Sequence, residues 1–96
     1  MSFDQDKNEI IDIIKKHIPN CKIYLFGSRA RGTNRPGSDI DIVLDMGKKI
    51  ERSLIADIND ELEESNIVFG VDVLDFNSIS QDIKDQILKE RVLWSS

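Results

Sequence analysis

The sequence has few of the residues that build disulfides and thiolate metal sites. Cys21 is the only cysteine and His17 the only histidine among 96 residues. A single thiol excludes an intrachain disulfide and a thiolate zinc cage, and it favours a reduced, cytoplasmic setting. Any metal that this chain binds would therefore meet mainly oxygen ligands.

The sequence also lacks long apolar runs and an excess of positive charge. No stretch approaches the ~20 apolar residues of a membrane helix, and the acidic N-terminus is unlike a signal peptide. Lys and Arg number 13 against 18 Asp and Glu, which argues against general nucleic-acid binding. We expect one domain over residues 1–96, with a shallow site that another chain would have to enclose.

Periodic apolar positions predict alternating helices and strands. Helical spacing of isoleucine and leucine is typical of amphipathic helices, and short runs of β-forming residues are typical of strands. The predicted order indicates an α/β (α+β) fold, a small mixed β-sheet with helices packed on one face. The predicted elements are helices over 3–18, 50–64 and 78–92, a helical turn over 28–32, a turn over 33–38, and strands over 22–26, 39–45 and 68–75.

Three aspartates are expected on the face of the sheet that the helices leave open. Asp39 and Asp41 lie two residues apart on one predicted strand, so their side chains point the same way with Cα atoms about 6.5 Å apart. Asp72, on an adjacent strand, comes within cross-strand reach. Clustered carboxylates repel unless a cation lies between them, and Mg²⁺ suits oxygen ligands. The alternative for any single aspartate is a solvated position on the exposed face of the sheet. We expect Asp45 and Asp75, at strand ends, to be turn or surface residues.

The stretch "FGSRARG" predicts an anion-binding turn before the first of these aspartates. Gly27 allows close backbone approach, and Ser28 opens a helical turn with free N–H groups and a hydroxyl donor. Arg29 and Arg31 either add positive charge there or pair with surface carboxylates. Near the C-terminus, Trp94 either caps the core or docks a partner.

The stretches "FGSRARGTNRPGSDIDIVLD" and "GVDVLD" together resemble the signature of the minimal nucleotidyltransferases of the DNA polymerase β-like superfamily. This resemblance implies a polymerase β-like nucleotidyltransferase fold and transfer of AMP from ATP to an acceptor hydroxyl. It assigns catalysis and the binding of two Mg²⁺ ions, with Mn²⁺ as a substitute, to Asp39, Asp41 and Asp72, the last as general base. The nucleotide-binding residues that it implies are Gly27, Ser28, Arg29 and Ser38.

The resemblance also implies a protein partner. Minimal nucleotidyltransferases of this kind are often encoded beside a HEPN-domain ribonuclease toxin, and they act as antitoxins by adding AMP to a toxin tyrosine. Two alternatives stay open: an antitoxin or binding module that neutralises its partner by contact alone, and a transferase acting on a small molecule or an RNA end. A dehalogenase-type phosphatase would also fit "DIDIV", but it needs a longer chain.

Overall fold

The computed structural model describes residues 3–35 and 37–96, so residues 1–2 and residue 36 of the predicted 33–38 turn lie outside it. The chain alternates between helices and strands along most of its length, as the apolar periodicity predicts. The helices are α1 (Phe3–His17), α2 (Ser28–Arg31), α3 (Arg52–Glu64) and α4 (Gln81–Glu90), with a 3₁₀ helix η1 (Phe76–Ser78). The strands are β1 (Lys22–Phe26), β2 (Ile40–Asp45), β3 (Val71–Asp75) and β4 (Val92–Ser95).

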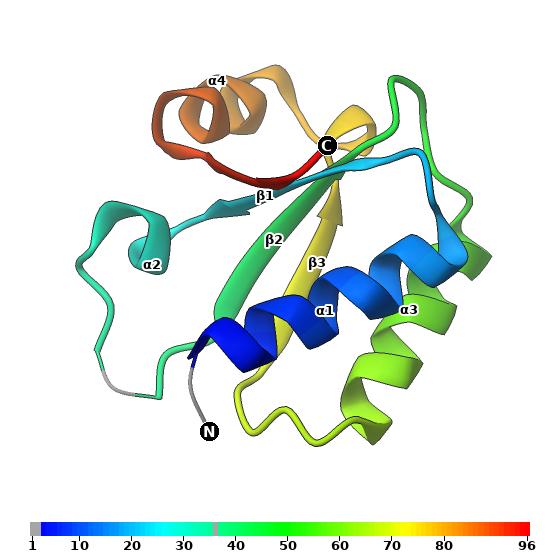
Figure 1. The fold of residues 1–96 in the computed structure, drawn as a ribbon. Coiled ribbons are helices and arrows are strands. Elements are labelled where there is room, and N and C mark those ends of the chain that lie inside the picture. Colours follow the sequence, from blue (N-terminus) through cyan, green and yellow to red (C-terminus); the bar gives the residue numbers. More distant parts are fainter. Residues whose placement is uncertain (1–2, 36) are drawn as a thin grey trace.

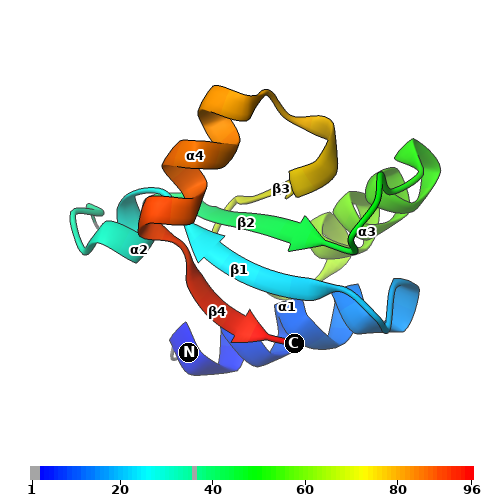
Figure 2. The same cartoon turned by 90° about the horizontal axis from the view of Figure 1, so that it is seen from above.

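The strands form one mixed sheet in the order β3-β2-β1-β4 (Figure 2). Strand β1 is antiparallel to both of its neighbours, whereas β2 and β3 run parallel. The register places Leu25 opposite Ile42 and Asp41 beside Asp72. The mixed sheet expected from the sequence is thereby confirmed.

Helices α1 and α3 cover one face of this sheet (Figure 1). Their apolar stripes, represented by Ile14 and Ile58, are fully buried against the alternate strand residues that face them. Burial of apolar surface at about 25 cal/mol per Å² is the main stabilising term for such a layer. The buried strand residues of this face are Ile23, Leu25, Ile40, Ile42, Leu44 and Val73.

Helix α4 lies on the opposite face, so the expectation that the helices pack on one face holds only for α1 and α3 (Figure 1). Ile87 of α4 packs with Tyr24 and Val43 in a second buried cluster. The physical reason is that this face carries the apolar side chains of Tyr24 and Val43, which need a cover. The aspartates lie on the same face, and Glu90 at the end of α4 reaches the turn beside them.

The C-terminal strand is the main element that the periodicity did not predict. Helix α4 ends at Glu90 and β4 pairs antiparallel with β1, with Val92 opposite Leu25. Trp94 packs against the main core, and the Lys7 ammonium lies 5.7 Å from its ring centre. Core packing is thus one of the two expected roles of this residue. Among the described residues, no helix combines the length and apolarity needed to cross a bilayer.

Candidate active site

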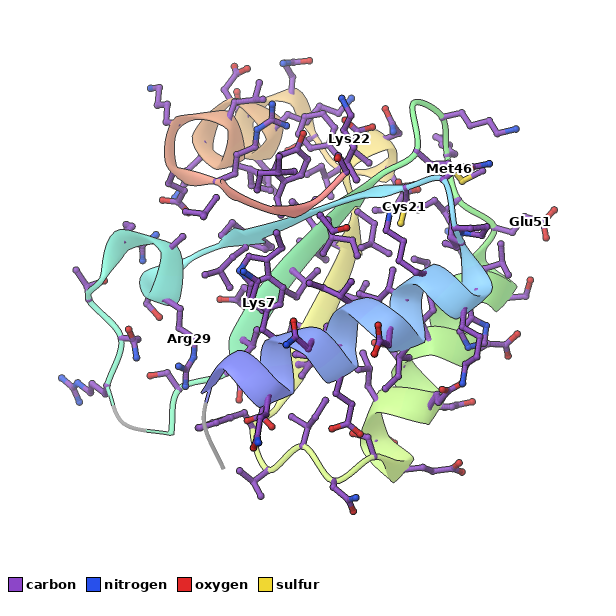
Figure 3. All side chains as sticks on the ribbon, in the orientation of Figure 1. Lys7, Cys21, Lys22, Arg29, Met46 and Glu51 are labelled. Carbon is purple, nitrogen blue, oxygen red and sulfur yellow. The ribbon has the colours of Figure 1, made fainter. Side chains whose placement is uncertain are left out.

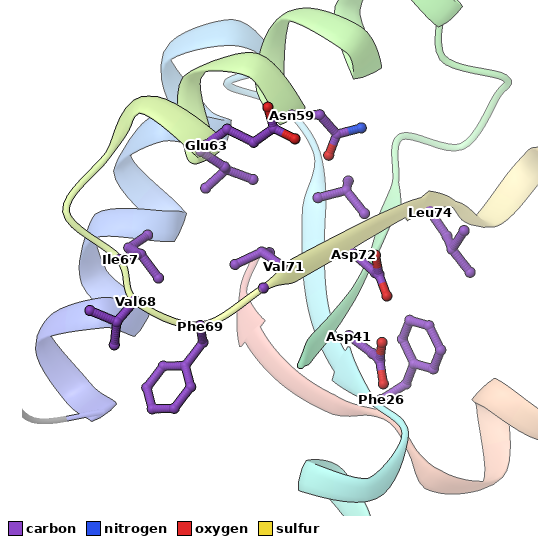
Figure 4. A pocket seen from close by; sticks show the side chains of 13 residues that line it. Phe26, Asp41, Asn59, Glu63, Ile67, Val68, Phe69, Val71, Asp72 and Leu74 are labelled. Carbon is purple, nitrogen blue, oxygen red and sulfur yellow. The ribbon is translucent and has the colours of Figure 1, made fainter. Parts of the chain in front are cut away.

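Two of the three predicted site aspartates lie next to each other on adjacent strands. Asp41 on β2 and Asp72 on β3 are direct register partners, and their side chains project to the same side beside Phe26 (Figure 4). Asp39 is exposed and lies one residue before the start of β2. The parallel pairing of β2 and β3 thus produces the cross-strand pair that the sequence predicts.

Glycines allow backbone to approach two of these carboxylates closely. A Cβ added to Gly27, where φ is +77°, would overlap Oδ2 of Asp41. A Cβ added to Gly70 would lie 2.5 Å from Oδ1 of Asp39, closer than real Cβ contacts. The carboxylates therefore use the space that the missing side chains leave, and any larger residue would displace them.

The site holds several negatively charged carboxylates close to one another. Burial raises the pKa of Asp41, and the neighbouring carboxylates of Asp72 and Asp39 raise it further. Arg31 opposes this effect, while Glu90 adds to it. None of the described residues donates a hydrogen bond to the three aspartates, so their oxygens are available to a cation.

The carboxylate oxygens fit a hard divalent ion whose remaining ligands come from the substrate and water. Within residues 3–35 and 37–96, no three His, Cys, Asp or Glu side chains lie close enough together to hold a metal ion, so Asp39, Asp41 and Asp72 do not form a three-carboxylate site. Mg²⁺ typically takes only one or two protein carboxylates, and its other ligands are substrate phosphates and water. The Asp41–Asp72 pair matches that requirement, since it offers oxygen ligands beside open space.

The predicted nucleotide-binding turn lies directly beside the aspartates. Gly27 precedes α2 as its N-cap residue, and its carbonyl accepts a 3.1 Å hydrogen bond from the Arg31 N–H. Ser28 is the first residue of α2, at the end of β1 nearest Asp41. The structure therefore places Gly27 and Ser28 where the sequence expects them, and their contacts with a nucleotide stay a prediction.

Arg29 and Ser38, the other two predicted nucleotide-binding residues, contact each other. The Arg29 guanidinium, which points from α2 toward the loop before β2, donates to the Ser38 carbonyl over 3.1 and 2.7 Å (Figure 3). It also lies 4.6 Å from the centre of the Phe69 ring. The Ser38 hydroxyl accepts from the Arg35 N–H at 3.0 Å. These contacts brace the loop that leads to Asp39, and direct nucleotide binding by Arg29 and Ser38 remains a prediction.

Glu90 is a site residue that the sequence analysis missed. Its carboxylate accepts hydrogen bonds from the Gly27 N–H at 3.1 Å and from Nη1 of Arg31 at 2.9 Å. Of the two roles expected for Arg31, added positive charge at the turn or pairing with a carboxylate, the structure shows the pairing. No local motif marks Glu90, because it meets Gly27 only through the pairing of β4 with β1.

An open groove of about 880 Å³ extends from the aspartates along β3 to α3 (Figure 4). Asp41, Asp72 and Phe26 form one end, and Asn59 and Glu63 of α3 form the other. Its remaining lining is Leu62, Ile67, Val68, Phe69, Gly70, Val71, Val73 and Leu74. The groove is open to solvent, in keeping with the shallow site expected for so short a chain.

Asp75 lies at a turn, as expected, since it accepts from the Asn77 N–H at 3.1 Å, but it is not exposed. It is buried at the end of β3, where it also accepts from the Ser78 hydroxyl at 2.6 Å and from the Ile50 N–H at 2.8 Å. Asp45 lies at a turn too, where it accepts from the Gly47 N–H at 2.9 Å. Strand-end position alone does not predict the burial of Asp75, because the Ile50 donor comes from a segment 25 positions away.

A mixed sheet with paired carboxylates beside a Gly-Ser turn defines a nucleotidyltransferase architecture. The profile of the family described as "Polymerase beta, Nucleotidyltransferase" matches residues 8–96. The chain therefore belongs to this family of enzymes, and the resemblance and fold class predicted from the sequence are confirmed.

Named relatives and solved structures agree with this assignment. The chain is 39% identical over 94 residues to a candidate protein adenylyltransferase (MJ0435) of Methanocaldococcus jannaschii, covering 96% of this chain and 97% of that protein. It is 30% identical to the protein adenylyltransferase MntA of Shewanella oneidensis, covering 95% of this chain and 66% of that protein. A toxin–antitoxin crystal structure with AMP-PNP matches with a TM-score of 0.78 and 28% identity, covering 93% of this chain and 72% of that chain.

Proposed function

We propose that this chain transfers AMP from ATP to a hydroxyl of a partner protein, and that the acceptor is a tyrosine of a HEPN ribonuclease toxin. The observation that carries the proposal is the Asp41–Asp72 register pair beside the Gly27–Ser28 turn. Support for a protein acceptor comes from the relatives named as protein adenylyltransferases and from the toxin–antitoxin neighbour. On this proposal, residues 1–96 work as one minimal domain, and the chain acts as an antitoxin.

The proposed reaction is an in-line displacement. The acceptor oxygen attacks the α-phosphorus of ATP, the new O–P bond forms, and the bond to the β-phosphate breaks to release pyrophosphate. In this proposal Asp72, which is exposed on the edge strand β3, takes the proton of the acceptor hydroxyl, the role that the resemblance implies. The α2 turn, with Gly27 and Ser28, holds the β- and γ-phosphates, and Arg29 and Ser38 order the loop beside them.

A divalent cation fits the carboxylates that have no protein donor. Asp39, Asp41 and Asp72 would hold Mg²⁺, with Mn²⁺ as a substitute and two ions as the expected number. Such ions lower the barrier by stabilising the charge that develops on the attacking and leaving oxygens of an in-line displacement. Burial contributes most to the raised pKa of Asp41 and the carboxylates of Asp72 and Asp39 add to it, and a bound cation would relieve that added repulsion.

A protein acceptor also fits the open groove. The groove of about 880 Å³ is open to solvent, so a partner chain would complete it. A partner that enclosed the site would exclude water and strengthen the electrostatic interactions within it. A cytoplasmic location, expected from the single cysteine, stays a prediction.

Intact-mass spectrometry tests the proposal. The chain is incubated with ATP, Mg²⁺ and the HEPN protein encoded beside its gene, and each protein is weighed. We expect the HEPN protein to gain whole multiples of one AMP, and Asp72→Asn to abolish the gain. Asp45→Asn, which changes a carboxylate at the other end of β2, is the matched control and should leave the gain intact.

The remaining outcomes separate the alternatives. A complex that forms and silences the HEPN protein without any mass gain would favour a contact-only antitoxin. AMP found on a small molecule or an RNA end, with none on the protein, would replace the acceptor class and leave the transfer chemistry in place. Peptide mapping of the modified partner then identifies the acceptor residue, and any site other than tyrosine would contradict that part of the proposal.

A further inference from the structure

One carboxylate from the last helix reaches into the turn beside the aspartates. Each oxygen of Glu90 accepts one hydrogen bond, Oε1 from the Gly27 N–H at 3.1 Å and Oε2 from Nη1 of Arg31 at 2.9 Å. The Glu90 side chain is only 14% exposed, whereas that of Arg31 is 45% exposed. Glu90 thus joins two segments that are 63 positions apart in the sequence, at a place that water largely does not reach.

The backbone of Glu90 is held firmly on both sides. It ends α4, whose Ile87 is buried in the second cluster, and the following Arg91 N–H donates to the Ile87 carbonyl at 2.8 Å. The Arg91 guanidinium lies 4.1 Å from the centre of the Tyr24 ring. Val92 then pairs with β1. Because the helix and the strand fix the residues around it, Glu90 is a fixed point to which the Gly27–Arg31 turn is tied.

Gly27 lies between this fixed point and the Asp41 carboxylate. Its N–H is directed to Glu90, while the position that its Cβ would take overlaps Oδ2 of Asp41. The hydrogen bond to Glu90 therefore helps to set how closely the turn approaches Asp41. It also engages the Gly27 N–H within the protein, so Gly27 serves phosphate binding through the shape of the turn, and the hydrogen-bond donors come from Ser28 and the groups that follow it.

We propose that Glu90 is a positioning residue for nucleotidyl transfer: it anchors the Gly27–Arg31 turn at a fixed distance from Asp41. This inference rests on the proposed function, because the turn holds phosphates and Asp41 holds the metal in that proposal. A loss of alignment between the two would slow the chemical step more than it weakens ATP binding.

The test compares Glu90→Gln and Glu90→Ala with a matched control, Glu61→Gln. Glu61 also links two elements by charge, since it accepts from Lys16 and lies 3.0 Å from Nε2 of His17, but it does so between α1 and α3. Hydrogen exchange of the Gly27 amide is measured on the isolated chain. The kcat and the KM for ATP are measured with Mg²⁺ and the HEPN acceptor.

We expect Glu90→Ala to speed exchange of the Gly27 amide about tenfold or more and to lower kcat by about ten- to a hundredfold, with the KM for ATP changed less than about threefold. Glu90→Gln keeps one carbonyl oxygen for the Gly27 N–H but loses the ion pair, so its effects should be smaller. Glu61→Gln should change none of these quantities. A fall in the thermal midpoint with unchanged kcat would mean that Glu90 only stabilises the fold.

Two other outcomes would overturn the inference. If Glu90 instead competed with phosphate for the turn, Glu90→Ala would lower the KM for ATP and leave kcat intact. If Gly27 exchange were the same in all variants, Glu90 would not anchor the turn at all. A wild-type chain that transfers no AMP to any acceptor would remove the proposed function, and the Gly27 exchange rates would still decide whether the anchor exists.

Discussion

Strands β2 and β3 carry aspartates at both ends, and the two ends differ in how the protein satisfies them. At the far end, Asp75 is 7% exposed and accepts hydrogen bonds from the Ile50 N–H and the Ser78 hydroxyl. At the near end, Asp41 and Asp72 are register partners, and no described residue donates a hydrogen bond to either. The sheet thus contains one carboxylate whose oxygens are hydrogen-bonded, that of Asp75, and a few residues away a pair of carboxylates that repel each other, those of Asp41 and Asp72.

The difference teaches that hydrogen-bond donors and burial together separate a structural carboxylate from a candidate functional one here. A buried acceptor whose lone pairs are satisfied stabilises the fold and has no capacity left for a ligand. Close carboxylates without donors cost free energy in the folded state, and a bound cation would recover it. Each of the experiments below alters one end of the strands and asks whether the other end is affected.

The largest expected effect is the loss of transfer in Asp41→Asn. A neutral amide is a poor ligand for a hard cation, and metal stabilisation of the transition state is worth several kcal/mol, so the rate should fall at least about a hundredfold. Because the substitution also removes repulsion with Asp72, the free energy of unfolding at neutral pH should not fall. AMP transfer assays and urea unfolding measure the two quantities. Retained activity would contradict the metal assignment.

The next largest effect should come from Asp75→Ala at the other end of the strands, where stability should fall and the rate of transfer should not. The Ile50 N–H would lose its buried acceptor, which costs about 1–3 kcal/mol of unfolding free energy. The rate of transfer per folded molecule should stay unchanged, because Asp75 does not contact the groove that holds Asp41. Urea unfolding combined with active-site titration checks both points. A variant of undiminished stability would mean that water replaces the carboxylate at no cost.

Glycine substitutions should give an intermediate effect that is confined to the near end. In Gly70→Ala the new Cβ would lie 2.5 Å from Oδ1 of Asp39, so that carboxylate has to move. A displacement of this size should lower the rate about tenfold or more. Gly27→Ala adds backbone strain at φ +77° to a similar clash with Asp41, so it should lower both rate and stability.

Gly37→Ala is the matched control for the glycine experiments. Its φ of +82° imposes the same left-handed strain, but nothing lies within 4 Å of the added Cβ. We expect a loss of about 1 kcal/mol in stability and no change in rate. A drop in rate for Gly37→Ala equal to that for Gly70→Ala would show that loop strain, and not displacement of a carboxylate, controls the chemistry.

Much of the fold was predictable because its signals are local. The isoleucine spacing of α1 and the short apolar run of β1 need no knowledge of distant residues, and "GSDID" places two carboxylates on one side of a strand. The alternation in β2 and β3 likewise predicted that Asp41 and Asp72 share a face. These inferences depend on residues a few positions apart, where backbone geometry alone decides.

The features that were missed depend on contacts between distant segments. Strand β4 is four residues long and follows a helix directly, so it has too few positions to show a period of two. The face of α4 is decided by Tyr24 and Val43, which share the aspartate face of the sheet and need a cover. Glu90 and Asp75 take their roles from donors 63 and 25 positions away, a separation that no local pattern encodes.

The smallest expected effect is a pH dependence of stability that belongs to the near end alone. The pKa of Asp41 is raised in the folded chain by burial and by Asp72, relative to an ordinary unfolded value of about 3.9. The folded state therefore binds this proton more tightly than the unfolded state does. Stability from this group is fully present below the unfolded pKa and is lost as pH rises through the raised folded value.

Wild-type protein should accordingly lose stability relative to Asp41→Asn as pH rises from about 4 toward neutrality, and Asp45→Asn should follow the wild type. Mg²⁺ should shrink the loss, because a cation between the carboxylates favours their charged forms. Urea midpoints across this pH range, with and without Mg²⁺, measure both effects. A difference between wild type and Asp41→Asn that stays flat with pH would mean that Asp41 and Asp72 do not repel in solution, and the two strand ends would then differ only in their hydrogen-bond donors.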